Sequence, residues 1–219
     1  MSEILQNIFL IVSAIFPVVN PLGAAPFFLT LTTSYSPAAR RALARRISFN
    51  SFFLLIGSYL IGAHILAFFG ISLPVVQVGG GLVVISTGWS MLKRRDEDER
   101  NEVKKTIYPP DTFRQAFYPM TLPLTVGPGS ISVALTLGAN APHAGINVVA
   151  IPAALAGSLV IALTIYLCYG FADRLASILG ATVMSVIMRL SSFLLVCIGV
   201  QIFWNGAKAL LSSLIVVAR

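Results

Sequence analysis

The chain has 219 residues, of which 57% are hydrophobic and only 11% are charged, and its formal net charge is +7. A soluble domain carries about a quarter charged residues, so this composition excludes an ordinary soluble protein. Strand-like alternation is absent, which argues against a membrane barrel. We therefore expect an all-α integral membrane protein that forms a single membrane domain over residues 1–219.

Six apolar segments approach or exceed the roughly 20 residues that a membrane-spanning helix needs. In chain order they cover residues 4–33, 47–71, 74–92, 113–139, 146–171 and 183–207. The first and fourth are too long for one straight span, and both contain prolines. The N-terminal stretch MSEILQ has an acidic Glu3 and no basic residue, so we expect the first segment to be a retained helix.

Basic residues gather in alternate loops. Arginines lie between the first and second segments, residues 93–114 hold seven Lys and Arg, and Arg174 follows the fifth segment. The loops after the second and fourth segments contain no Lys or Arg. The positive-inside rule then places the basic loops in the cytoplasm and both termini outside, although Lys208 and Arg219 weigh against this at the C-terminus.

The long polar stretch 93–112 is predicted to be a cytoplasmic linker between two three-helix halves, 1–92 and 113–219. Because each half crosses the membrane an odd number of times, the second half enters the membrane inverted relative to the first. Inverted repeats are typical of secondary transporters.

Three prolines repeat with the same spacing in the two halves. Pro17, Pro21 and Pro26 match Pro119, Pro123 and Pro128, and the members of each pair are 102 residues apart. Proline removes a backbone donor and interrupts a helix, so we predict that the first and fourth segments are broken. Breaks at matching positions of two halves indicate a transporter's central site. The alternative is a set of structural kinks, which are common in membrane helices.

A new half-helix is expected to begin after each break, near Gly23 and near Gly129. Its first turn exposes free N–H groups and about half a positive charge. Two such ends near the midplane would suit an anionic group, a carboxylate or a phosphate. The predicted substrate-binding residues are Asn20, Pro21, Gly23, Pro123, Thr125, Gly127, Gly129 and Ser130, with Arg189 and Gln201 as second choices.

Few ionisable or amide side chains lie within the apolar segments. Arg189 either reaches the headgroups or faces inward, and His64 is either a structural histidine or a proton carrier. Gln77 and Gln201 are expected to face the bundle interior, because an amide in lipid needs a partner. Glycines 79–81 either pack closely against a neighbouring helix or expose their backbone to substrate.

The motifs around the breaks also resemble a known family. These motifs are Asn20-Pro21-Leu22-Gly23 with Pro26, residues 62–81, the run Pro123 to Ser130, and Arg189 with Ile198-Gly199-Val200-Gln201. They are similar to the MarC family of bacterial integral membrane proteins over nearly the whole chain, and the similarity weakens only in the polar loop between the third and fourth segments. The resemblance implies a six-helix inner-membrane protein, grouped with the LysE-type exporters. It also implies, from some members, transport of neutral amino acids such as alanine, glycine and serine.

The sequence thus predicts an inner-membrane exporter or exchanger of a small solute with an anionic group, a neutral amino acid being the first choice. The alternative is a flippase or transporter of a phosphate-headed lipid, since the same helix ends suit a phosphate. An enzyme is not expected, because the spans offer no Ser/His/Asp set, metal-ligand cluster or close acid pair. The expected partners are the small-molecule substrate and membrane lipids, without nucleic acid, cofactor or metal. Assembly into a homo-oligomer is left open.

Overall fold

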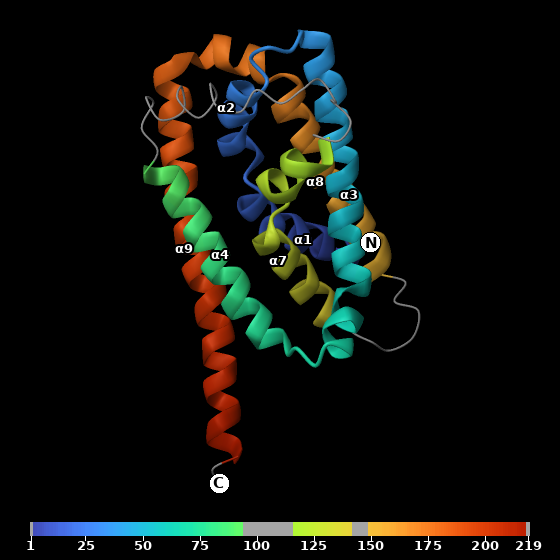
Figure 1. Cartoon of the computed structure of the whole chain (residues 1–219). Coiled ribbons are helices and arrows are strands. Elements are labelled where there is room, and N and C mark those ends of the chain that lie inside the picture. Colours follow the sequence, from blue (N-terminus) through green and yellow to red (C-terminus); the bar gives the residue numbers. More distant parts are fainter. Residues whose placement is uncertain (1, 94–115, 142–148, 218–219) are drawn as a thin grey trace.

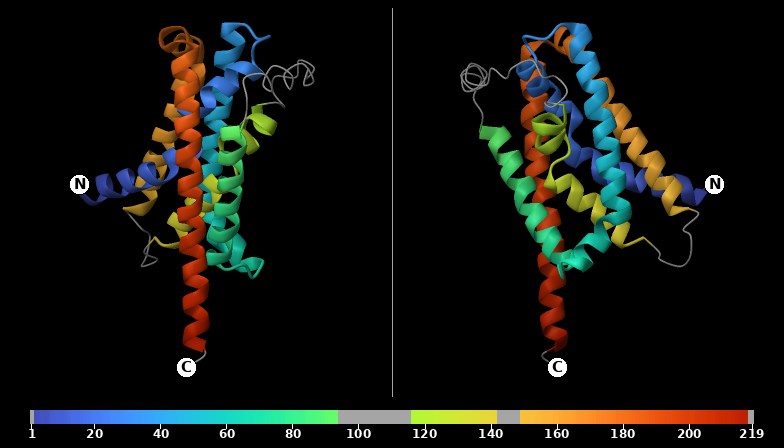
Figure 2. Two further views of the ribbon diagram at one scale, coloured as in Figure 1. Left: turned by 90° about the vertical axis from the view of Figure 1, so that its left-hand side faces the viewer. Right: turned by 45° about the vertical axis from the view of Figure 1, so that its right-hand side comes forward.

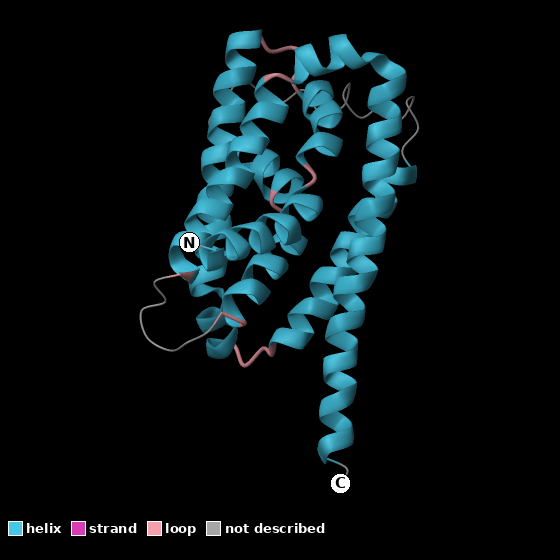
Figure 3. Cartoon of the chain, turned by 180° about the vertical axis from the view of Figure 1, so that it is seen from behind, coloured by secondary structure: helices cyan, strands magenta, loops and turns pink. Residues whose placement is uncertain are grey.

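A computed structural model describes residues 2–93, 116–141 and 149–217. The elements are α1 (Ser2–Val19), α2 (Pro21–Leu31), α3 (Pro37–Phe68), α4 (Leu73–Lys93), the π-helical η1 (Ala116–Thr125), α7 (Pro128–Ala139), α8 (Ala150–Gly170) and α9 (Ala172–Val217). Figure 3 shows these helices joined by short loops, with no strand in the described ranges. The predicted all-α class is confirmed, and the predicted linker 93–112 lies outside the described residues apart from Lys93.

Five helices of the described chain are long and apolar enough to cross a membrane, with α1 and α2 taken together as one of them. The bent pair η1–α7 makes a sixth when it is counted as a single span. The chain is therefore a multi-pass integral membrane protein. The predicted segments coincide with these helices, but α3 begins at Pro37, well before residue 47. Ser36 caps this end by accepting a hydrogen bond from Ala39 N at 3.2 Å, with Pro37 at the first helical position.

The described connections between the long helices lie at two opposite ends of the bundle (Figure 1). Residues 32–36 and the turn between α8 and α9 lie at the upper end in that view. Residues 69–72, between α3 and α4, lie at the lower end, and the C-terminal part of α9 extends beyond it. Two further views show the same arrangement (Figure 2). The arginines in the first turns of α3 therefore lie at the same end as Arg174.

The first predicted break is confined to one residue. Pro17 lies inside α1, which continues to Val19, and α2 begins at Pro21. Asn20 between them has φ 48° and ψ 55°, a left-handed conformation that asparagine tolerates better than most residues. Asn20 N still donates to Phe16 O at 2.9 Å, so the ladder of helical hydrogen bonds is hardly interrupted.

The second break is far larger. The axes of η1 and α7 differ by 71°, and Tyr118 and Leu122 within η1 have non-helical backbone angles. Gly127 is extended and precedes Pro128, the first residue of α7. The two proline-rich stretches therefore share their spacing but differ in local structure.

Helices α4 and α9 pack together through glycines. A Cβ atom on Gly81 would lie 2.5 Å from Phe203 N, and one on Gly206 would lie 2.6 Å from Pro74 O. Such contacts require glycine, because any side chain would push the backbones apart. Of the glycines at 79–81, Gly81 meets α9 and Gly80 meets Ser132 of α7, whereas Gly79 faces open space.

Candidate functional site

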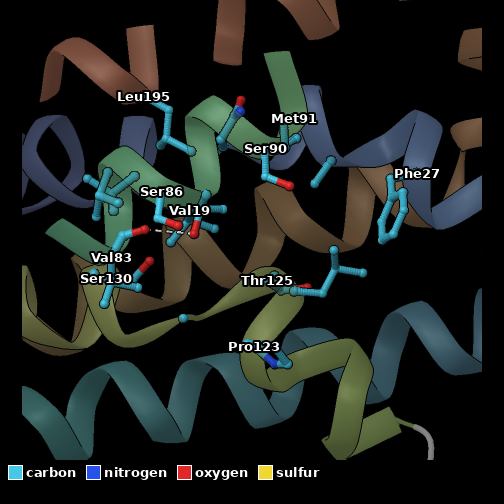
Figure 4. A pocket seen from close by; sticks show the side chains of 18 of the residues that line it. Val19, Phe27, Val83, Ser86, Ser90, Met91, Pro123, Thr125, Ser130 and Leu195 are labelled. Atoms are coloured by element: carbon cyan, nitrogen blue, oxygen red, sulfur yellow. Dashed lines mark hydrogen bonds between the residues drawn. The ribbon is translucent and has the colours of Figure 1, made fainter. Parts of the chain in front are cut away.

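A cavity of about 670 Å³ lies between the two proline-rich stretches (Figure 4). This volume is within the range of roughly 300–1,000 Å³ that is common for small-molecule sites. Residues of α1, α2, α4, η1, α7 and α9 line it, together with Asn20 and Gly127 between them. Its polar side chains are Asn20, Thr30, Ser86, Thr87, Ser90, Thr125 and Ser130, and valines, Phe27, Met91 and Leu195 are among the apolar ones.

Six of the ten predicted site residues line this cavity. They are Asn20, Pro123, Thr125, Gly127, Gly129 and Ser130. Pro21 and Gly23 are buried but do not line it. A Cβ atom on Gly23 would lie 2.7 Å from Ser191 Cβ, so Gly23 allows α2 to approach α9.

The two second-choice residues lie elsewhere. Arg189 and Gln201 are exposed side chains of α9 outside the cavity. Gln201 donates to Asn205 Oδ1 at 2.9 Å on this exposed face. The expectation that Gln201 faces the bundle interior is therefore wrong, because the face of α9 that meets α4 is made by Gly199, Phe203 and Gly206.

The N-terminus of α7 forms the part of the cavity best suited to an anion. Its N-cap Gly127 has no side chain to cap the helix, and Pro128 has no N–H. The N–H groups of Gly129 and Ser130 are thus in the first turn, where the helix dipole is positive and the backbone lacks intrahelical acceptors. Both residues line the cavity, and Gly129 also permits close contact with α4, since a Cβ there would lie 2.0 Å from Val84 Cγ2.

The N-terminus of α2 is capped by its own sequence. Asn20 Oδ1 accepts a hydrogen bond from Gly23 N at 3.2 Å, so this end does not present the free N–H groups that the sequence predicted. The Nδ2 atom of Asn20 is buried and has no hydrogen-bond partner among the described residues. An unsatisfied buried donor costs about 1–3 kcal/mol.

A row of hydroxyl groups on α4 was missed by the sequence reasoning. Ser86, Thr87 and Ser90 line the cavity, and Ser86 and Ser90 are one helical turn apart on the same face. Figure 4 shows Ser86 on the same side of the cavity as Ser130. The signal available in the sequence was this spacing of hydroxyls within the apolar third segment.

Thr125 supports the irregular backbone of η1. Its hydroxyl donates to Met120 O at 2.8 Å and lies 3.1 Å from the Tyr169 hydroxyl of α8. Tyr169 in turn stacks on Phe28 of α2, with ring centroids 4.6 Å apart. This buried chain of contacts connects α2, α8 and η1, so it fixes the wall of the cavity.

Comparison with known proteins identifies the group to which the chain belongs. The model of the MarC family integral membrane protein matches residues 5–211. The chain belongs to the MarC family. It is 33% identical to membrane protein YvbG of Bacillus subtilis (strain 168), over 90% of this chain and 92% of the relative.

Two further relatives match the MarC-family chain over nearly its full length. A membrane protein of Methanocaldococcus jannaschii is 32% identical over 94% of this chain and 98% of its own. The inner membrane protein MarC of Salmonella typhimurium is 28% identical over 97% and 99%, respectively. No solved structure matches the chain. The resemblance noted from the proline and glycine motifs is confirmed.

The cavity of this MarC-family protein has an uncharged lining. None of the described residues that line it is Asp, Glu, Lys, Arg or His. His64 is an exposed residue of α3 and does not line the cavity. Any recognition of an anion here would rely on backbone N–H groups, hydroxyls and the Asn20 amide.

An ion pair joins the two halves at the arginine-rich end of the MarC-family protein. Arg40 of α3 is only 7% exposed and pairs with Asp173 in the first turn of α9. The same guanidinium donates to Thr32 O at 2.7 Å and to Thr32 Oγ1 at 3.0 Å. Arg174, next to Asp173 in sequence, lies over the Phe171 ring, with its guanidinium carbon 5.8 Å from the ring centroid.

Proposed function

We propose that this protein is a transporter of a small solute that carries an anionic group, with a neutral amino acid as the first choice of substrate. The observation that carries this proposal is the uncapped N-terminus of α7 at the wall of a cavity of about 670 Å³. A helix N-terminus with free backbone N–H groups is a favourable place for a carboxylate. No enzymatic step or cofactor is part of the proposal.

The polar groups suggest how such a solute would be held. The carboxylate would accept hydrogen bonds from the backbone N–H groups of Gly129 and Ser130. Asn20 Nδ2 lacks a partner among the described residues but is buried in this conformation, so it would supply a third donor only after its side chain turned toward the cavity. The hydroxyls of Ser86 and Ser90 can accept from the ammonium group, and the valines leave room for a small apolar side chain.

Export is the proposed direction of transport, and the extent of the cavity is compatible with it. Its lining runs along α2 from Asn20 to Leu31 and along α4 from Val83 to Met91, toward the end of the bundle that carries the arginines. The positive-inside rule makes that end cytoplasmic and both termini external. With this orientation the cavity would take up substrate from the cytoplasm, as export requires. The membrane would be an inner membrane, as in the name of the Salmonella relative.

Alternating access of the cavity to the two sides of the membrane would follow from the inverted repeat that the sequence predicts. Residues 1–92 and 113–219, joined by the linker 93–112, would rock against each other around the cavity. At the end away from the arginines, Ser132 Oγ of α7 donates to Val76 O of α4 at 3.1 Å. This contact between the halves would open when the substrate is released outside.

The proposal is tested with purified protein in lipid vesicles loaded with labelled alanine. The double variant Ser86→Ala with Ser90→Ala should slow efflux about tenfold or more, because each lost hydrogen bond removes about 1 kcal/mol of binding. Ser212→Ala is the matched control, since this exposed hydroxyl near the end of α9 bonds only within its own helix. Alanine efflux that is equal in all three proteins, or no greater than in empty vesicles, would contradict the proposal.

The second candidate is a transporter of phosphate-headed lipids. It is favoured by the exposure of Ser86, Thr87 and Ser90, which means that the α4 side of the cavity is not sealed. A phosphate would use the same N-terminus of α7. Dithionite quenching of a fluorescent phospholipid in the same vesicles separates the two candidates, because only a lipid transporter would expose the label of the inner leaflet.

A further inference from the structure

One face of α9 points away from the rest of the bundle. Along it, exposed residues follow alternating steps of four and three, and they are Leu190, Leu194, Cys197, Gln201, Trp204, Lys208 and Leu211. We call these residues the outer stripe of α9. Figure 2 (left) shows α9 running along the surface of the bundle, in front of the other described helices. Steps of four and three are the spacing at which two helices pack along a common seam.

The outer stripe carries an amide at the depth of the membrane interior. Gly199 and Phe203, on either side of Gln201 in sequence, pack against Gly81 near the middle of α4. Gln201 is therefore close to the middle of the span, on the side opposite α4. Its side chain donates to Asn205 Oδ1 at 2.9 Å, and both residues are exposed.

Two amides at this depth have more hydrogen-bonding groups than their mutual bond uses. Each side chain has two donor hydrogens and an acceptor oxygen with two lone pairs. The bond between Gln201 and Asn205 uses one donor and one acceptor site, so most of this capacity faces outward. Acyl chains offer no partner there, and polar groups left in hydrocarbon are costly.

We propose that the outer stripe of α9 is the interface through which two copies of this chain associate in the membrane. Copies inserted in the same orientation can pair around a two-fold axis parallel to the membrane normal, which places each residue of the stripe opposite its counterpart. A glutamine side chain is its own complement, because its nitrogen donates to the oxygen of an identical amide. A polar residue at one position of an otherwise apolar seam also fixes the register of such a pair.

The charge of Lys208 is compatible with this pairing. Gly206 packs against Pro74, at the beginning of α4, so Lys208 lies near the membrane surface. A lysine at this depth can extend its ammonium group to the headgroups and away from the axis. Gln201 is thus the polar residue of the outer stripe that meets its counterpart in the hydrocarbon.

Cys197 provides a native probe of the proposed interface. It is exposed in the outer stripe, one turn before Gln201, and would face its counterpart across the axis. Cysteines form a disulfide only when their Cα atoms are within about 7 Å, so the reaction reports this register. The second cysteine of the described chain, Cys168 of α8, is removed by Cys168→Ser.

The experiment uses membranes that contain the full chain with Cys168→Ser, treated with copper phenanthroline. We expect a covalent dimer through Cys197. The matched control moves the cysteine to the lipid-facing side of α8, with Cys197→Ser and Leu159→Cys, since Leu159 is 61% exposed. This control should give little dimer, and equal yields from the two proteins would mean random collision and would overturn the proposal.

The role of the amides is tested with Gln201→Leu combined with Asn205→Leu. Loss of two symmetric hydrogen bonds should lower the dimer fraction about tenfold at a fixed ratio of protein to lipid, measured by mass photometry in nanodiscs. Thermal melting of the same variant reports folding, since a leucine is stable in hydrocarbon. An undiminished dimer fraction in a folded variant, or a wild-type protein that is monomeric at every ratio tested, would overturn the proposal.

Discussion

At the scale of single residues, Arg40 is the most buried charge in the described chain. The Arg40 side chain is 9% exposed and its guanidinium binds Asp173 and two oxygens of Thr32, whereas the side chain of Asp173 is 50% exposed. The pair is therefore asymmetric in its exposure to solvent. Removing the Asp173 carboxylate would leave the buried Arg40 cation without a carboxylate partner. This should cost more than removing Arg40, which would leave only a half-exposed carboxylate.

Substitution of Asp173 should therefore lower stability. We expect Asp173→Asn to cost about 1–2 kcal/mol, less than a fully buried pair because the carboxylate is half exposed, and to lower the melting temperature by about 4 °C in detergent. Arg174→Gln is the control, since its exposed charge lies over an aromatic ring and should matter by less than about 0.5 kcal/mol. Equal melting temperatures of Asp173→Asn and wild type would show that Arg40 is satisfied by Thr32 alone.

At the scale of elements, α4 and α9 are held at a distance that glycine sets. Gly88 and Gly199 extend the contacts of Gly81 and Gly206, with a Cβ on Gly88 only 2.9 Å from Ser192 O. Because the neighbours are backbone atoms, they cannot move aside without a shift of a whole helix. The α4 wall of the cavity is thus positioned by the packing of α9.

A single methyl group should disturb this pair. We expect Gly81→Ala to reduce stability by about 2 kcal/mol or more, because the added Cβ would lie 2.5 Å from Phe203 N. Gly79→Ala should be neutral or slightly stabilising, since nothing lies within 4 Å of its Cβ position and alanine favours the helix. Thermal unfolding monitored by size-exclusion chromatography compares the two, and the same loss in both would refute the role of close packing.

The positions of the helices were largely predictable, because hydropathy and proline are local signals that can be read directly from the sequence. The predicted apolar segments agree with the five or six candidate spans of the described chain. The half-helices were expected to begin near Gly23 and near Gly129, whereas α2 begins at Pro21 and α7 at Pro128. What proline could not reveal is the size of each break: Asn20 keeps the helical hydrogen bonds nearly intact, whereas η1 has two non-helical residues and a bend of 71°.

The rotation of each helix about its axis was the harder part to predict. Ser86 and Ser90 face the cavity and Gln201 faces outward, and composition alone distinguishes neither case in a segment that is apolar on every side. The prediction for Gln201 rested on the cost of placing an amide in lipid. It assumed that only the bundle interior could provide a hydrogen-bond partner. The packing of Gly199 and Gly206 against α4 decides the orientation, and it becomes visible only in the folded bundle.

At the scale of the whole molecule, the connections at the two ends differ in charge. The arginines of α3 lie at the end that also holds residues 32–36, and residues 69–72 lie at the other end without Lys or Arg. The proposed orientation therefore places residues 32–36 in the cytoplasm and residues 69–72 outside. A single labelling experiment can test both.

Single cysteines report the orientation in a background with Cys168→Ser and Cys197→Ser. We expect Ser72→Cys to react with a membrane-impermeant maleimide in intact spheroplasts, and Ser34→Cys to react only after lysis, because both positions are exposed but lie at opposite ends. The reverse pattern would place the arginine-rich end outside. It would also reverse the proposed direction of transport without affecting the cavity itself.

The uncharged lining of the cavity has a consequence for adaptation among relatives. The N–H groups at the start of α7 belong to the main chain, so they persist through most side-chain substitutions and do not titrate near neutral pH. The hydroxyls of α4, by contrast, depend on individual side chains at Ser86, Thr87 and Ser90. If the proposed function holds, relatives could alter which solute they accept by exchanging residues on one helix, while the backbone N–H groups proposed to meet the negative charge are inherited with the bend of the backbone.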